Sequence, residues 1–440
     1  MPIAIGLNNR ELGPVTSLIA TCFLAFAVGF VFNAFCERKE LDRKTSLWLM
    51  LLTFTVIPLV LMIPFIWNNV FNSPNFFDLL TNAYFETVSG FTTTGFSFVT
   101  QPEALPASIL FYRSLVEFIG GIGFVYILAA FLFPTEGLDD FAETFGVDKI
   151  GTNLKKVFMS VLLIYTTIVI IFTIAFYFVY KPDLLIASCT AIDVLTGGYQ
   201  PNVTAGIGIF QISILILMLL GSFNFEFHFN LFSLKLRKLL TPEIKLYLEI
   251  IAASGLIVCT LAWVNPFESL FNVVSMASST GIELFSVAST TIPAKVFLIL
   301  VGLVGGCAFS MAGGIRIKRI QTLVDAVRRK GNEPSREELK VVLTNIINLF
   351  IALVVLSLIF STMGVNLIDS VFEVSSALTT NGISIGATTV GMPVGYKWLL
   401  IIAMLIGRVE VVTIFTAVSG LPIWNNVKHL DGILKKRIRR

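Results

Sequence analysis

The sequence predicts an all-α, polytopic membrane protein built from four similar helical units and one extra N-terminal transmembrane helix. Of the 440 residues, 55% are hydrophobic and 13% are charged, whereas a soluble protein carries about 25% charged residues. Apolar stretches long enough to cross a bilayer occur along the whole chain, and a Gly-containing tetrapeptide recurs four times between them. The net charge of +3 gives no reason to expect nucleic acid as a partner.

Nine transmembrane helices are expected, because a run of roughly 20 mostly apolar residues crosses the hydrocarbon core. The runs cover about 14–35, 46–68, 107–133, 154–180, 206–232, 244–264, 294–312, 340–363 and 396–420. The first run has no basic segment at its start and no cleavage-site pattern, so we expect a helix and not a signal peptide.

The distribution of Lys and Arg predicts the orientation, because cytoplasmic connections are enriched in these residues. Most of the 31 basic residues lie in or beside one set of connections, which covers 37–45, 134–153, 233–243, 313–339 and 421–440. The opposite side carries Arg10, Lys181, Lys295 and Lys397. We therefore expect the N-terminus outside and the C-terminus in the cytoplasm.

Four long outer connections are each expected to begin a short helix that does not span the bilayer. Their starts are marked by Asp78, by Lys181-Pro182-Asp183, by Asn265-Pro266, and by Asn366 with Asp369. Asp and Asn cap helix N-termini, and Pro fits the first turn. After two or three turns each segment reaches a tetrapeptide: TTGF (93–96), TGGY (196–199), STGI (279–282) and TNGI (380–383).

The four copies share a register, which indicates one supersecondary unit used four times. The residues nine places before Gly95, Gly198, Gly281 and Gly382 are Glu86, Cys189, Asn272 and Glu373. The predicted division is an N-terminal helix with its basic loop, four units and a basic tail: 1–45, 46–140, 141–240, 241–335, 336–425 and 426–440.

Non-helical backbone at membrane depth occurs where it is buried in protein or lines a watery cavity. Four such segments around one central pore would offer rings of carbonyl oxygens to a cation, and Gly permits the backbone angles that this needs. No tetrapeptide carries Asp or Glu, which favours a weakly hydrated monovalent ion over a divalent one. The alternative is that these clusters only form turns or close helix crossings. The candidate filter residues are Thr93, Thr94, Gly95, Thr196, Gly197, Gly198, Ser279, Thr280, Gly281, Thr380, Asn381 and Gly382.

Several separated motifs resemble the TrkH/TrkG type of the Trk–Ktr–HKT superfamily of potassium transport proteins. They are VSGFTTTG (88–95), ILFYRSLVEFIGGIGF (109–124), GGCAFSMAGGIRIKRI (305–320) and IGRVEVVTIF (406–415). The resemblance implies a pseudo-fourfold pore in the cytoplasmic membrane of a prokaryote, with potassium as the substrate. It also implies a homodimer and a cytoplasmic TrkA-type regulatory subunit, through which alone a nucleotide such as ATP, ADP or NAD would act. In this family, Gly at all four filter positions is associated with selectivity for potassium.

The segment 305–314 interrupts the seventh span with four glycines. The plain interpretation is a tight helix crossing through small residues, whereas the family resemblance implies an intramembrane gating loop. Arg316, Lys318 and Arg319 follow at once and are expected to anchor the helix end at the cytoplasmic face. The candidate gate residues are Gly305, Gly306, Ser310, Gly313, Gly314 and Arg408.

Charged residues inside predicted spans are functional candidates, because a charge at that depth is costly. Arg408 is expected to lie below the filter as a barrier to cations, or else to be a structural residue with a buried partner such as Glu410. Arg113 and Glu117 are four residues apart and so are expected to pair on one helix face. Glu86 and Glu373 are expected to hydrogen-bond the filter backbone from behind.

The leading functional hypothesis is potassium uptake through a gated, channel-like pore. The alternatives are a sodium- or proton-coupled potassium transporter, a sodium-permeable relative, and a membrane enzyme. Inverted repeats would indicate a coupled transporter, but all four short segments fall on one side. No nucleophile–base or metal-ligand constellation supports an enzyme or a bound cofactor. The segments 321–339 and 435–440 either dock the regulatory subunit or contact anionic lipid.

Overall fold

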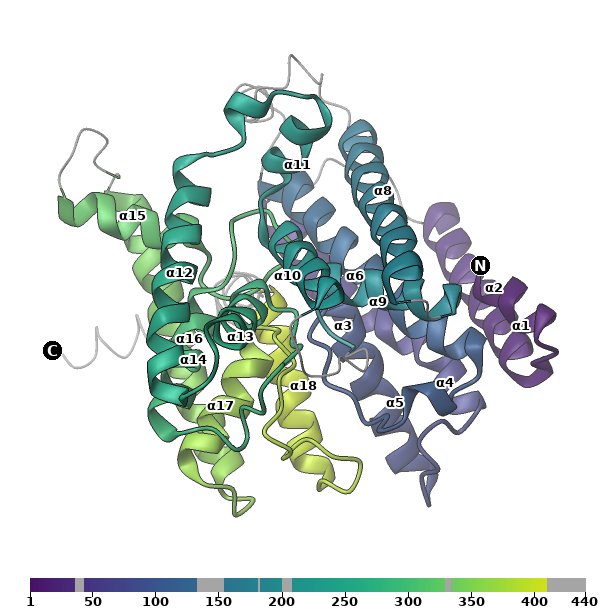
Figure 1. The fold of residues 1–440 in the computed structure, drawn as a ribbon. Helices are drawn as coiled ribbons and strands as arrows, with labels where there is room; N and C mark the ends of the chain where they lie inside the picture. Colours follow the sequence, from purple (N-terminus) through teal and green to yellow (C-terminus); the bar gives the residue numbers. More distant parts are fainter. Residues whose placement is uncertain are drawn as a thin grey trace, which may run out of the picture.

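The computed structural model describes residues 1–35, 43–132, 154–180, 183–199, 208–328, 334 and 336–409. All regular structure in these ranges is helical, which confirms the all-α prediction (Figure 1). The longer helices are α2 (Leu12–Phe35), α3 (Arg43–Leu61), α6 (Ala107–Leu132), α8 (Leu154–Tyr180), α10 (Ile209–Ser222), α12 (Pro242–Ala262), α14 (Ile292–Val304), α16 (Arg336–Ser361) and α18 (Val394–Val409).

The helices that lead into the four tetrapeptides are α5 (Phe76–Phe91), α9 (Leu184–Thr196), α13 (Pro266–Ser278) and α17 (Leu367–Leu378). Further short elements are α1 (Pro2–Asn8), α4 (Ile63–Trp67), α11 (Phe225–Phe232), α15 (Ile317–Arg328), and the 3₁₀ helices η1 (Pro102–Ala104) and η2 (Leu236–Lys238). In Figure 1, α1 and α2 lie at one edge of the molecule and α15 at the opposite edge.

Six helices in the described ranges are long and apolar enough to cross a membrane, and one bent pair adds a seventh candidate. The predicted span 206–232 is wrong as a single helix, because α10 and α11 meet at 111°. Asn224 causes the new start, since its side chain accepts the N–H of Phe227 and caps α11. The predicted span 294–312 stops at Val304, where α14 ends. The second half of the span 396–420 lies outside the described residues.

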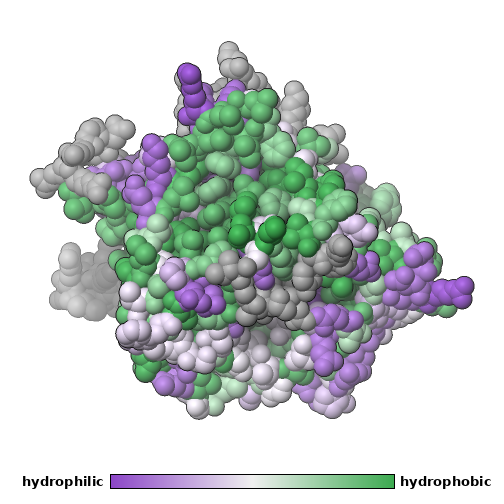
Figure 2. Space-filling model, viewed as in Figure 1, coloured by the Kyte–Doolittle hydropathy of each residue, from purple (hydrophilic) through white to green (hydrophobic). Residues whose placement is uncertain are grey.

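The spans differ in how deeply they are buried. Of the 18 most apolar consecutive residues in each helix, 72% are buried in α6, but 22% are buried in α2 and 17% in α16. Exposed Phe23, Phe26 and Phe30 on α2 are therefore placed to face acyl chains. Figure 2 shows a broad field of hydrophobic residues across the upper and middle part of one face, and more hydrophilic residues towards its lower edge. The α6 helix is thus central, and α2 and α16 are peripheral.

The helices that lead into the tetrapeptides pack in a closed circular order. Each contacts the longer helix that follows the preceding tetrapeptide: α9 contacts α6, α13 contacts α10, α17 contacts α14, and α5 contacts α18. The last of these contacts joins helices from opposite ends of the chain. This packing brings all four tetrapeptides to the middle of the described structure.

Candidate functional site

The starts of the four short helices largely follow the predicted signals. Asn366 caps α17 by accepting the N–H of Ile368, and α13 begins at Pro266 after Asn265. The predicted start at Asp78 is wrong, because α5 begins at Phe76. Its cap is Asn75, whose side-chain oxygen accepts the N–H of Asp78 at 2.9 Å.

The four tetrapeptides lie against one another, and glycines form their contacts. A Cβ at any of these glycines would collide with the backbone of a neighbouring copy, so a larger residue cannot be accommodated without a shift. The colliding pairs are Gly95 with Gly198, Gly197 with Ser279, Gly281 with Asn381, and Gly382 with Thr94. The twelve candidate filter residues are therefore brought together in one cluster, and all but Gly382 are buried.

Three tetrapeptides share an unusual backbone conformation, with positive φ at their first and third residues. The φ values are +57° and +79° at Thr93 and Gly95, +59° and +76° at Ser279 and Gly281, and +50° and +82° at Thr380 and Gly382. Positive φ is unfavourable for residues with a Cβ. Two of these strained residues, Thr93 and Thr380, also have buried hydroxyls without a hydrogen-bond partner among the described residues. Such strain is typical of functional backbone.

The second tetrapeptide departs from the predicted register by one residue. The N–H groups of Thr94, Thr280 and Asn381 each donate to the carbonyl five residues earlier, and Gly198 does the same to Asp193. Gly198 therefore corresponds to Thr94, and Tyr199 stands where the other copies have Gly. The cause is that α9 continues to Thr196, inside the tetrapeptide, while the other three helices end before theirs.

Three of the short helices brace the backbone that follows their own tetrapeptide. In each case a side-chain oxygen accepts the N–H of the residue twelve places later. The pairs are Glu86 with Phe98 at 2.9 Å, Asn272 with Leu284 at 2.8 Å, and Glu373 with Ile385 at 3.0 Å. Glu86 and Glu373 were expected to hydrogen-bond the filter backbone itself, whereas their backbone partners Phe98 and Ile385 lie two residues beyond the tetrapeptides.

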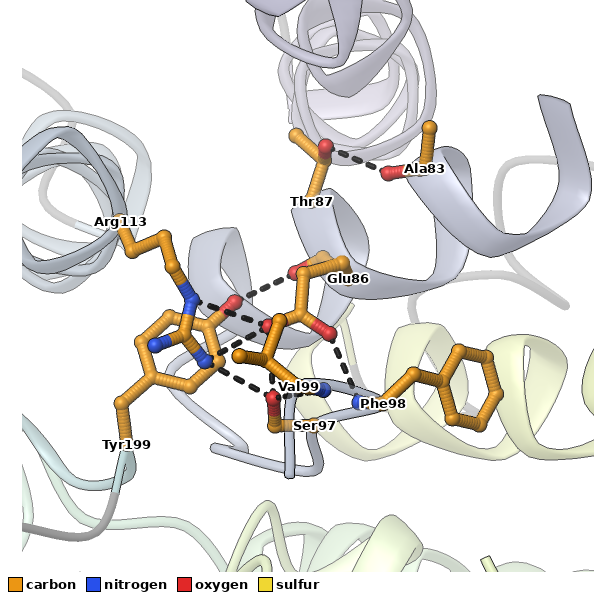
Figure 3. Close-up of polar contacts among 8 residues, drawn as sticks. All are labelled: Ala83, Glu86, Thr87, Ser97, Phe98, Val99, Arg113 and Tyr199. Carbon is orange, nitrogen blue, oxygen red and sulfur yellow. Dashed lines mark hydrogen bonds and ion pairs between the residues drawn. The ribbon is translucent and has the colours of Figure 1, made fainter. Parts of the chain in front are cut away.

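Glu86 is also the centre of a buried ion pair (Figure 3). Its Oε1 accepts hydrogen bonds from Arg113 Nη2 at 2.7 Å, Arg113 Nε at 3.1 Å and Ser97 Oγ at 2.8 Å. The Arg113 guanidinium lies 4.0 Å from the ring centre of Tyr199, whose hydroxyl donates to the Glu86 carbonyl at 2.6 Å. This network connects the first tetrapeptide, α6 and the residue after Gly198.

The predicted pairing of Arg113 with Glu117 is therefore wrong. Arg113 forms its ion pair with Glu86, because α5 packs against α6 and places that carboxylate beside the guanidinium. The Glu117 carboxylate instead lies against the backbone of Gly198, where a Cβ on that glycine would overlap Oε1. The partner of Arg113 is therefore determined by the packing of α5 on α6, and not by the four-residue spacing within α6.

We expect Arg113→Met to lower the stability by roughly 3–5 kcal/mol, because it leaves the Glu86 carboxylate buried without its cation. Glu86→Gln/Arg113→Met should be less destabilised than the sum of the single variants. Thermal or denaturant unfolding in detergent measures both effects. The control is Lys295→Met, which removes the cation of a less buried pair with Asp369 (2.7 Å) and should cost clearly less than Arg113→Met, because the Asp369 side chain stays 26% exposed to solvent. Equal losses in the two Met variants would contradict the role of the Glu86 pair.

The Gly-rich segment after α14 folds into the bend between α10 and α11. The N–H groups of Cys307 and Met311 donate to the carbonyls of Ser222 (3.0 Å) and Gly221 (3.3 Å). Phe225 at the start of α11 donates in turn to the Phe309 carbonyl at 3.2 Å. The broken helix therefore exposes backbone groups that bind this segment, which we call the 305–316 loop.

The glycines of the 305–316 loop allow it to pack closely on itself and on the third tetrapeptide. Gly305 and Gly314 have φ of +70° and +82°, and a Cβ on Gly305 would collide with the Gly313 backbone. The Gly313 N–H donates to Ser279 Oγ at 2.9 Å. Ser310 is buried and donates to the Cys307 carbonyl at 2.7 Å, which stabilises the turn within the loop.

Glu243, near the start of α12, also fixes this loop and was not identified from the sequence. Its Oε1 accepts the N–H of Ala308 at 2.7 Å, and its Oε2 accepts Asn224 Nδ2 at 3.1 Å. One carboxylate thus joins the loop to the bend between α10 and α11. In the sequence, Thr241-Pro242-Glu243 has the pattern of an ordinary helix start, so nothing marked Glu243 as a loop contact.

Arg408 on α18 is 1% exposed and lies next to the loop. Its Nη1 donates to the Met311 carbonyl at 2.9 Å, and its guanidinium carbon lies 3.8 Å from the ring centre of Phe124. Its Nε and Nη2 have no hydrogen-bond partner among the described residues. Glu410, the predicted partner, lies outside the described residues. Arg316 is 8% exposed and also lies over the Phe124 ring, with its guanidinium carbon 5.2 Å from the ring centre.

On the other side of the tetrapeptides is a cavity of about 250 Å³. Gly95 and Gly382 form part of its wall, together with Ser97, Arg113 and Glu283. Burial raises the pKa of the Glu283 carboxyl, and the N–H of Val287, which donates to it, opposes that shift. The candidate filter therefore lies between this cavity and the 305–316 loop.

Comparison with known proteins confirms the predicted resemblance. The TrkH family model, described as a cation transport protein, matches residues 265–428. The Trk system potassium uptake protein TrkH of Salmonella typhimurium is 26% identical over 94% of this chain and 93% of its own length. TrkG of Escherichia coli is 28% identical over 77% of this chain and 78% of its own length.

The fold is similar to the crystal structure of the potassium transporter TrkH from Vibrio parahaemolyticus. The TM-score is 0.78 at 21% identity, and the match covers 96% of this chain and 95% of the other. At that identity the likeness establishes the fold. Together with the apolar spans and the relatives, it identifies a multi-pass membrane protein.

Proposed function

We propose that this relative of the TrkH/TrkG proteins takes up potassium through a channel-like pore at the centre of its four tetrapeptides. The observation that carries the proposal is the closed ring of tetrapeptides with positive φ at alternate residues in three copies. Alternation of left-handed and other backbone conformations turns successive carbonyls to one side of a strand, where they can replace an ion's hydration shell. The names of the Salmonella and Escherichia relatives support potassium as that ion.

The proposed pore consists of four pseudo-repeats, each with a re-entrant short helix and one quarter of the filter. The circular contacts of α5, α9, α13 and α17 support this arrangement. The carbonyl end of a helix dipole favours a cation, and all four helices end at the tetrapeptides. Because the second copy is shifted by one residue, the proposed ion sites are not fourfold symmetric.

The 305–316 loop is the proposed gate. It lies directly against the third tetrapeptide through Gly313 and Ser279, and Arg408 places a buried positive charge beside it. A cation that leaves the filter would meet both the loop and that charge. Opening then requires release of the contacts with Ser222, Gly221 and Glu243.

The assembly and its location are also proposals. We place the protein in the cytoplasmic membrane of a prokaryote with the 305–316 loop towards the cytoplasm, as the Lys and Arg distribution predicts. The protein is proposed to form a homodimer. A TrkA-type subunit that binds the nucleotide would regulate the gate. The word "system" in the relatives' names is consistent with additional subunits.

Flux into proteoliposomes tests the proposal. Purified protein should admit potassium or rubidium in preference to sodium when no sodium or proton gradient is imposed. Liposomes without protein supply the background. Equal potassium and sodium flux would refute the selectivity, and flux only in the presence of an imposed sodium or proton gradient would favour coupled transport.

A further inference from the structure

We propose that Glu283 forms an outer binding site for monovalent cations, which concentrates potassium in front of the filter. This inference rests on the proposed potassium pore and adds a residue outside the tetrapeptides. Glu283 follows the third filter glycine, Gly281, by two places and lines the cavity of about 250 Å³.

Comparison of three copies shows why this carboxylate faces the cavity. In the first and fourth copies, the short-helix acids Glu86 and Glu373 accept hydrogen bonds from the Ser residues eleven places later, Ser97 and Ser384. In the third copy the short helix carries Asn272 in place of the acid. Glu283, eleven residues later, stands in place of the Ser.

Asn272 performs the bracing role without a charge. Its Oδ1 accepts the N–H of Leu284 and its Nδ2 donates to the Phe285 carbonyl at 2.9 Å. The carboxylate at position 283 is therefore not needed behind the filter. Glu283 is held by a single backbone contact, in which Oε2 accepts the Val287 N–H at 3.0 Å.

The cavity around Glu283 has the chemistry of a site for weakly held monovalent cations. Hydroxyl side chains from two other outer loops line it, namely Thr100, Ser384 and Thr388. Ser97 lines it too, but its oxygen already accepts hydrogen bonds from Arg113 and Val99. Glu283 is the one carboxylate among the described residues in this lining. A divalent cation would usually be bound by several carboxylates, so this lining favours a monovalent ion.

The positive charge in the cavity wall does not cancel Glu283. Arg113 also lines the cavity, but its guanidinium is 3% exposed and forms its ion pair with Glu86. The charge that remains for an entering ion is that of Glu283. A negative charge in a confined mouth raises the local concentration of cations, and salt screens this effect.

Glu283→Gln should raise the external potassium concentration for half-maximal uptake by about threefold to tenfold at low ionic strength. The maximal rate should stay within about twofold, because the tetrapeptides are intact. The difference should shrink when an impermeant salt is added. Glu103→Gln is the matched control, since Glu103 lies exposed on η1 in an outer loop and does not line the cavity.

Glu283→Cys separates charge from shape and provides a test if Glu283→Gln is poorly folded. A negatively charged methanethiosulfonate reagent should restore a low half-saturating concentration, and a positively charged reagent should raise it further. Wild-type protein treated with the same reagents controls for the native cysteines. Unchanged half-saturation in Glu283→Gln, or the same response to both reagents, would overturn this inference. Absence of potassium flux through the wild-type protein would instead refute the proposed pore.

Discussion

Gly95→Ser is expected to reduce the preference for potassium over sodium by about tenfold and to lower the potassium flux. Gly95 has a φ of +79°, a conformation that costs a residue with a Cβ roughly 1–2 kcal/mol. The added Cβ would also collide with the Gly198 backbone. The first and second tetrapeptides must then separate, and carbonyls set at the wrong spacing no longer compensate the dehydration of potassium better than that of sodium.

Paired flux measurements of rubidium and sodium in proteoliposomes check this prediction. The matched control is Gly391→Ser, because a Cβ at Gly391 meets no atom within 4 Å and no positive φ constrains it. The control should keep the wild-type ratio. An unchanged ratio in Gly95→Ser, with normal folding, would mean that the first tetrapeptide does not select the ion.

Features that depend on composition and local signals were predictable from the sequence. The apolar runs 14–35 and 244–264 became helices within about two residues of their predicted bounds, because the bilayer fixes their length. Asn366 and Pro266 marked helix starts through local hydrogen bonding and a fixed φ. The tetrapeptides stand out by repetition in the sequence, and the circular packing of the helices that lead into them brings them into contact.

Features that depend on contacts between distant segments were not predictable. Arg113 has Glu117 at helical spacing, yet its ion pair is with Glu86, and only the packing of α5 on α6 selects between them. The bend before Asn224 receives the 305–316 loop through backbone groups, which carry no side-chain signal. The shift in the second tetrapeptide arises from one further helical residue, Thr196, a difference below the precision of any helix end read from sequence.

Arg408→Met is expected to raise the potassium flux by about tenfold at fixed potassium concentration. At an effective dielectric constant of 20, a unit positive charge raises the energy of a cation that passes about 10 Å from it by about 1.7 kcal/mol, and 1.36 kcal/mol corresponds to a tenfold change in rate. The substitution also removes the hydrogen bond to the Met311 carbonyl, which loosens the 305–316 loop. Both effects act in the direction of higher flux.

Stability distinguishes this barrier from a structural role. Two of the three guanidinium nitrogens of Arg408 have no hydrogen-bond partner among the described residues, so replacement by an apolar side chain of similar length should cost little or even stabilise the fold. Arg408→Lys keeps the charge and should keep the low flux. Faster flux in Arg408→Met with an unchanged melting temperature, together with low flux in Arg408→Lys, would establish the electrostatic barrier. A lower melting temperature together with reduced flux in both variants would show that the guanidinium acts as a packing and hydrogen-bonding group, and that the barrier lies in the loop alone.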